Sequence, residues 1–133
     1  MMSKSFADRL SDDLKNAQKP EFGQAYKALR EIAEGIREAL SKGAAGQLDV
    51  VLEPGYVTNL GQQYRLRLGI PARKWEETLL RAYIPSEGFP IKLDLGDEEP
   101  VTCGDRKQLD DAVLRFMKKP EVANRMSTVR EML

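Results

Sequence analysis

The sequence predicts an α+β fold: two N-terminal helices, an antiparallel meander of four to five strands, and two C-terminal helices packed on one sheet face. Apolar and polar residues alternate over residues 63–70 and again over residues 89–95, which is the period of a strand with one buried face. Apolar residues before and after this region recur every three or four positions, which indicates amphipathic helices. All 133 residues are expected to form one domain with a single core.

The first helix is expected to carry a narrow apolar stripe, Phe6, Leu10 and Leu14, with Ser3 or Ser5 as its N-cap. A short helix of this kind is marginal in water and gains little from burying one row of side chains against its own domain. Residues 1–19 are therefore predicted to contact another chain, and homodimerisation is the simplest version. The alternatives are a helix folded back on the second helix and a frayed end.

The second helix is predicted over residues 21–42, because Pro20 suits the first helical position and Gly43 a stop. Its wide apolar face consists of Phe22, Tyr26, Leu29, Ile32, Ala33, Ile36 and Leu40. The predicted strands are residues 48–53, closed by Pro54 and Gly55, then residues 63–70, Trp75–Ile84, residues 89–95 and Val101–Cys103. Asn59 and Gly61 favour a loop over residues 56–61, and the alternative is that residues 56–58 extend the first strand's pairing. The strand face expected to pack on the helices carries Tyr64, Leu66, Leu68, Leu80, Ile91 and Leu93.

Two more helices are predicted after the sheet. Asp105 is a favourable N-cap for the first of them, with Gln108 in the capping-box position. The apolar stripe of this helix is Leu109, Ala112, Val113, Phe116 and Met117. Pro120 starts the last helix, whose apolar side carries Val122, Met126, Val129 and Leu133.

Composition narrows the classes of function. The 21 Lys and Arg equal the 21 Asp and Glu, and a chain with zero net charge is not typical of a dedicated nucleic-acid binder. Histidine is absent, which removes the commonest general base, the His-activated nucleophiles and histidine metal sites. With a single cysteine as well, no structural zinc site can be built from the usual ligands. We expect no catalytic residues, no metal and no cofactor.

The chain is expected to be cytoplasmic and not to enter a membrane. It contains no apolar run near the ~20 residues that a membrane-spanning helix needs. Its first residues lack the apolar core of a secretory signal. One cysteine permits no internal disulfide, which fits a reducing compartment.

Arg65, Arg67, Arg81 and Lys92 occupy polar positions of three successive strands, with Tyr83 near Arg81. If the strands are neighbours, these cations form a stripe on the open face of the sheet, suited to an acidic peptide or a nucleic-acid backbone. The alternative is a solvated face on which Asp94, Asp49 and Glu53 pair with the cations across strands.

Two single residues also invite a functional interpretation. Trp75 lies in a polar setting near a strand start, where it can anchor a partner or cover the edge of the core. Cys103 lies just before a helix, and a helix N-terminus can lower the pKa of a thiol. Asp105 opposes a thiolate, however, so Cys103 is interpreted as a small buried hydrophobic residue.

The run Tyr83-Ile84-Pro85-Ser86-Glu87-Gly88-Phe89-Pro90 resembles the Tyr-Pro…Pro strand–turn–strand signature of RWD and ubiquitin-conjugating folds, although Ile84 interrupts the Tyr-Pro pair. Those folds also place a helix before a meander and helices after it. The chain has no His-Pro-Asn segment, so the conjugating role of the family is not carried over to Cys103. The order of elements is similar to type III secretion chaperones as well, which are usually acidic dimers.

Together these features predict a non-catalytic protein-interaction module, such as an accessory subunit, a chaperone-like adaptor or a regulator. The expected partner is a protein. The first alternative is nucleic-acid binding through Arg65, Arg67, Arg81 and Lys92. The second is a thiol enzyme or carrier that uses Cys103 on a ubiquitin-conjugating-like fold.

Overall fold

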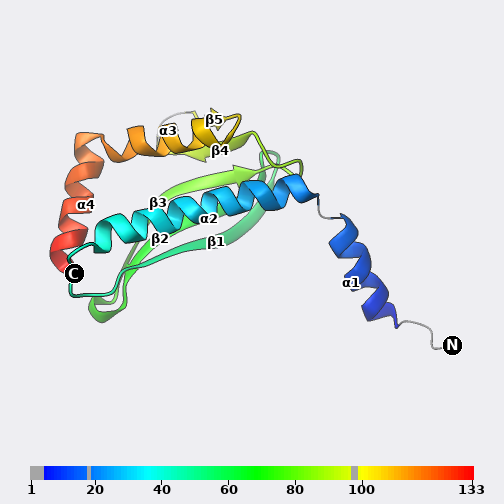
Figure 1. The fold of residues 1–133 in the computed structure, drawn as a ribbon, viewed down its shortest axis with the longest axis horizontal. Helices are drawn as coiled ribbons and strands as arrows, with labels where there is room; N and C mark the ends of the chain where they lie inside the picture. The colour runs from blue at the N-terminus through cyan, green and yellow to red at the C-terminus, as the bar shows by residue number, and fades with distance from the viewer. Residues whose placement is uncertain (1–4, 18, 97–98) are drawn as a thin grey trace.

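The computed structural model describes residues 5–17, 19–96 and 99–133, and it confirms the predicted α+β class and order of elements (Figure 1). Two helices come first, α1 (Phe6–Ala17) and α2 (Pro20–Ser41). The strands are β1 (Asp49–Thr58), β2 (Gly61–Ile70), β3 (Trp75–Ile84), β4 (Ile91–Asp94) and β5 (Val101–Cys103). They form one antiparallel sheet in the order β1-β2-β3-β4-β5. The chain ends with α3 (Arg106–Met117) and α4 (Pro120–Met132).

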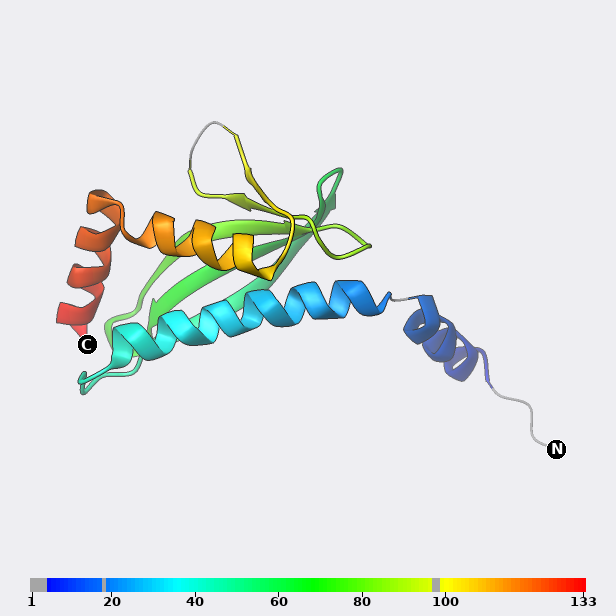
Figure 2. The same cartoon turned by 45° about the horizontal axis from the view of Figure 1, so that its top comes forward.

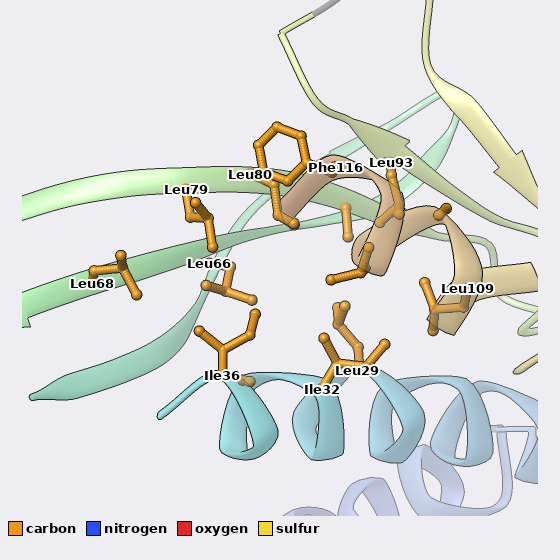
Figure 3. Packing of buried hydrophobic residues seen from close by; sticks show 14 of the residues in the cluster. Leu29, Ile32, Ile36, Leu66, Leu68, Leu79, Leu80, Leu93, Leu109 and Phe116 are labelled. Atoms are coloured by element: carbon orange, nitrogen blue, oxygen red, sulfur yellow. The ribbon is translucent and has the colours of Figure 1, made fainter. Parts of the chain in front are cut away.

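The core lies between the long helix α2 and the sheet. Figures 1 and 2 show α2 running along one face of β1, β2 and β3, with α3 beside it on the same face. Leu29, Ile32 and Ile36 point from α2 toward the strands (Figure 3). The strand face predicted to meet the helices is buried at Leu66, Leu68, Leu80, Ile91 and Leu93. Tyr64, predicted on the same face, is half-buried, with its ring centroid 5.2 Å from that of Tyr26.

The cap predicted for α3 is present, with one difference. The Asp105 carboxylate accepts the N–H of Gln108 at 2.8 Å, as an N-cap should. In a standard capping box the Gln108 side chain would accept the N–H of Asp105 itself. Here Gln108 Oε1 accepts the N–H of Gly104 at 2.6 Å instead, so the cap also holds the residue that leads out of β5.

The last helix, α4, closes the end of the core opposite to α1 (Figure 1). Val122, Met126 and Val129 are buried in it. Its polar side reaches the sheet, because Arg125 donates to Glu77 on β3. The Leu133 carbonyl oxygen accepts the N–H of Gly46 at 2.9 Å, which connects α4 to the α2–β1 joint.

The prediction that Pro54 and Gly55 close the first strand is wrong. β1 continues to Thr58, with an irregularity in register between Pro54 and Val57. β1 is an edge strand of the sheet, and proline is tolerated on edges and at bulges because its missing N–H breaks no ladder there. β2 accordingly begins at Gly61, which is opposite Thr58, two residues earlier than predicted.

The turn between β3 and β4 packs against the start of α2. Gly88 has φ +91°, and a Cβ on it would lie 2.4 Å from the Glu21 carbonyl oxygen, so only glycine fits. Its N–H donates to the Pro85 carbonyl at 2.9 Å. The close approach of Gly88 to Glu21 holds the N-terminal end of α2 against the β3–β4 turn. The position of this end determines where α1 leaves the domain.

Replacement of Leu68 by alanine should lower the free energy of unfolding by about 2–5 kcal/mol, because the side chain is fully buried between β2 and the helices. The measurement is chemical denaturation followed by circular dichroism. Val51→Ala is the matched control: Val51 lies on the opposite sheet face, is 38% exposed, and should cost less than about 1 kcal/mol. Equal midpoints for wild type and Leu68→Ala would contradict the assignment of the buried face.

Candidate protein-interaction surface

The first helix forms as predicted and leaves its apolar stripe uncovered. Ser5 Oγ accepts the N–H of Asp8 at 3.2 Å, which makes Ser5 the N-cap; the alternative cap, Ser3, lies outside the described residues. The exposed fractions of Phe6, Leu10 and Leu14 are 79%, 44% and 62%. None of the three belongs to the core or packs against it. Large apolar side chains gathered on one face in this way are typical of interaction sites.

The position of α1 explains this exposure. Figures 1 and 2 both show it directed away from the sheet and from the other helices. The chain reaches Lys19 and then enters α2 at Pro20, which cannot continue the hydrogen-bond ladder of α1. The two helices are therefore separate, and the stripe is available to another chain. Contact with that chain remains a prediction, and residues 1–4 and 18 of the predicted segment lie outside the described residues.

A hollow of about 660 Å³ lies where α1 leaves the domain, between the α1–α2 junction, the β1–β2 hairpin and the β3–β4 turn. Its apolar lining comes from Ala17, Phe22, Val57 and Leu60, among others. Lys19 and Glu87 form an ion pair of 3.8 Å at its border. The C-terminal end of α1 therefore lies beside a partly apolar hollow.

The apolar tip of the β1–β2 hairpin was not predicted from the sequence. Tyr56 and Val57 are 85% and 78% exposed, although both are residues that strands usually bury. The sequence does contain an indication of this exposure, because Tyr56 and Val57 directly follow Pro54 and Gly55. An edge strand that bulges at such residues turns its next side chains away from the core. The tip lies on the same side of the domain as α1 and adds to its exposed apolar surface (Figure 1).

The predicted basic stripe exists on the open sheet face, but acids are interleaved with it. Glu53, Arg65, Arg81 and Asp94 are successive partners in the register across β1 to β4. Arg65 and Arg67 both donate to Glu53, the latter through Nε at 2.6 Å. Arg67 also pairs with Glu76 at 2.8 Å.

These ion pairs have electrostatic consequences. Hydrogen bonds from Arg65 and then Arg67 lower the pKa of the Glu53 carboxyl below its usual range. Hydrogen bonding to Glu53 likewise raises the pKa of the Arg67 guanidinium. The charges of Arg65 and Arg67 are thus locally neutralised, which favours the interpretation of this part of the face as solvated and cross-paired. Nucleic-acid binding there stays a prediction.

The remaining predicted partner-binding residues lie in three places. Tyr83 shares the open face with Arg81, and its hydroxyl accepts from Gln63 Nε2 at 3.2 Å. Lys92, opposite Tyr83 on β4, borders the hollow next to α1. Trp75 pairs with Ile70 at the far end of β3 and is half-buried against the core, which fits an edge-of-core residue better than a free anchor. The structure therefore does not gather the predicted residues into one surface.

Cys103 is 1% exposed in β5, as the structural interpretation predicts. Burial and then the nearby charge of Asp105 raise the pKa of its thiol. Both effects suppress the thiolate, which is the nucleophilic form.

Two other features of the chain bear on its chemistry. Within the part of the chain that the structure describes, His, Cys, Asp and Glu side chains do not gather in groups of three that could hold a metal ion. None of the described helices combines the length and the apolar character needed to cross a membrane.

The comparisons with known proteins leave the family open. No protein-family model matches the chain, no curated protein matches it, and no solved structure matches it.

Native Cys103 should react slowly with iodoacetamide and reach stoichiometric labelling only after unfolding, because the buried thiol has a raised pKa. Mass spectrometry of the labelled protein measures this. Ser127→Cys adds a thiol at an exposed position of α4 and serves as the accessible control. Rapid complete labelling of native wild type would reopen the thiol-enzyme alternative.

The ion pairs of Glu53 should make stability sensitive to acid. A folded-state pKa below the unfolded value gives stability that is present above about pH 4.3 and is lost as the pH falls through the folded pKa. Glu53→Gln should flatten the acid limb of a plot of Tm against pH. The double variant Arg65→Gln/Arg67→Gln should flatten the same limb, because it removes the donors. If Tm fell with decreasing pH as steeply in both variants as in the wild type, the assignment of acid sensitivity to the Glu53 ion pairs would be contradicted.

Proposed function

We propose that this protein is a non-catalytic protein-interaction module and that α1 is the element that contacts its partner. The supporting observation is the stripe of Phe6, Leu10 and Leu14, which are exposed on a capped helix set apart from the domain. A helix that presents anchors at i, i+4 and i+8 matches the helix-in-groove mode of recognition.

The energetics of α1 support an interaction role. An isolated helix of 12 residues is marginal in water. Burying a leucine or phenylalanine side chain is worth about 1.5–3 kcal/mol, and in this conformation α1 obtains little of that from its own domain. A partner that covers the stripe supplies the missing stabilisation and orders the helix at the same time.

Two observations support the non-catalytic part of the proposal. The chain has no histidine, so acid–base chemistry near neutral pH would depend on groups whose ordinary pKa values are further from 7. The single thiol is buried in β5 with a raised pKa, which disfavours nucleophilic catalysis.

The charged sheet face favours a protein partner over a nucleic acid. Glu53 and Glu76 engage the guanidinium groups of Arg65 and Arg67, which phosphates would otherwise bind. A nucleic-acid phosphate would have to displace these carboxylates. Binding through that face would also weaken steeply with salt, whereas binding through an apolar stripe would not.

Leu10→Asp should abolish assembly with the partner, because it places a carboxylate in the middle of the stripe. Ser11→Asp is the matched control, since it adds the same charge one residue along, about 100° around the helix and outside the stripe. Sedimentation velocity and affinity capture from the native host, read by mass spectrometry, compare the two variants with wild type. The proposal fails if Leu10→Asp changes neither the oligomeric state nor the set of captured proteins.

A further inference from the structure

An apolar groove runs between α2 and α3; exposed Gly35, Ala39 and Leu114 line it together with buried core residues of both helices. Its volume is about 400 Å³. It is lined by Ile32, Gly35, Ile36, Ala39 and Leu40 of α2 and by Asp110, Val113, Leu114 and Met117 of α3. Leu114 is 55% exposed on its edge. Only one of the lining residues carries a charge, which is the composition of a site for apolar side chains.

Gly35 keeps the groove open. A Cβ built at this position meets no atom within 4 Å, so the space above the α2 backbone is empty where most residues would fill it. Glycine lowers helix stability inside α2 relative to alanine. A close approach by another chain gives that glycine a physical role.

Folded back along α2, the α1 helix of the same chain would reach only the start of this groove. At 1.5 Å per residue, α1 is about 18 Å long, while Gly35 lies about 22 Å and Leu40 about 30 Å along α2 from Pro20. If α1 folded back on α2 at the junction, Phe6 would come beside Glu31 and Leu10 beside Lys27. Those α2 side chains are charged and exposed, so the stripe would meet a polar surface.

We propose that the groove receives α1 from a second copy of this chain, in a reciprocal exchange that forms a closed dimer. The inference rests on the proposed function of α1 and names its partner and docking site. Each copy has one uncovered apolar helix and one apolar groove whose centre its own helix does not reach. A two-fold arrangement satisfies both at once and leaves no unpaired site for further growth.

The border of the α2–α3 groove and the border of the α1 stripe carry opposite charges that can pair. Lys107 and Lys118 are seven residues before and four residues after Leu114, so they lie on the same side of α3. Asp13 is three residues after Leu10 and borders the stripe of α1. A helix seated with Leu10 near Leu114 would bring these opposite charges to the rim of the interface.

Cysteine cross-linking tests the contact directly. Leu10→Cys and Leu114→Cys are prepared in separate chains, mixed and oxidised. A disulfide-linked dimer should form in the mixture and in neither variant alone, because buried Cys103 contributes no thiol. Asp8→Cys mixed with Leu114→Cys is the control, since Asp8 lies on the other side of α1. Cross-linking no greater in the mixture than in the separate variants would overturn the proposal.

Filling the groove is the second test. Gly35→Leu should raise the dimer dissociation constant about 30-fold or more, as loss of a central hot spot does, while the better helix propensity of leucine preserves the fold. Gly23→Leu is the matched control: Gly23 lies on the same helix about 120° around its axis, and a Cβ there also meets nothing within 4 Å. Circular dichroism checks folding, and sedimentation equilibrium measures dissociation.

The two tests separate this inference from the proposed function. A Gly35→Leu protein that dimerises like wild type, when Leu10→Asp does not, shows that α1 binds elsewhere: the groove is then wrong and the interaction role of α1 is retained. A wild-type chain that is monomeric overturns the exchanged dimer. The proposed function then depends on whether Leu10→Asp still loses captured proteins that Ser11→Asp retains.

Discussion

The packing of α2 across β1, β2 and β3 is the interaction on which the rest of the structure depends. A twisted antiparallel sheet with one apolar face needs a cover, and α2 supplies it along most of the strand length (Figure 2). Leu29, Ile32 and Ile36 meet the leucines of β2 and β3 there (Figure 3). The smaller elements add to this unit, with α3 beside α2 and against β5 and α4 across the end. Removing a methyl-rich side chain from this contact therefore affects the whole domain.

The same packing determines what is left uncovered. Because α2 begins at Pro20 and its start is held by the Gly88 turn, the chain before it leaves the domain at one end of the sheet. The hydrophobic face of α2 is committed to the sheet, and the flank toward α3 retains a groove. An exposed apolar helix and an exposed apolar groove thus arise from one constraint, which is the length and placement of α2.

The open face of the sheet is held by ion pairs rather than by apolar packing. Acids lie on both sides of its central arginines: Glu53 engages Arg65 and Arg67, and Asp94 lies opposite Arg81 in the register. Cross-strand pairs of this kind favour the correct register and keep a solvated face soluble. They also engage Arg65 and Arg67, two of the four cations that would otherwise attract a polyanion. The apolar surfaces at α1 and α2–α3 are therefore the stronger candidates for function.

The order and type of the elements were predictable from the sequence, because the apolar period is two in the strands and near 3.6 in the helices regardless of tertiary context. The cap Asp105 and the breaks at Pro20 and Pro120 are also local chemistry, and they were predicted correctly; Ser5 was one of two caps predicted for α1. The path of β1 through Pro54 was not predicted, because tolerance of proline depends on whether a neighbouring strand lies alongside. Pairing of Glu53 with cations across strands was one of the two interpretations of the charged face, but which arginines it binds depends on the strand register. The groove at Gly35 was hidden, because a space between two helices depends on how α2 and α3 cross. The sequence alone thus determined the local periods, caps and breaks, which depend on near neighbours; the tertiary structure decided which apolar residues remain exposed, because burial depends on contacts between distant parts of the chain.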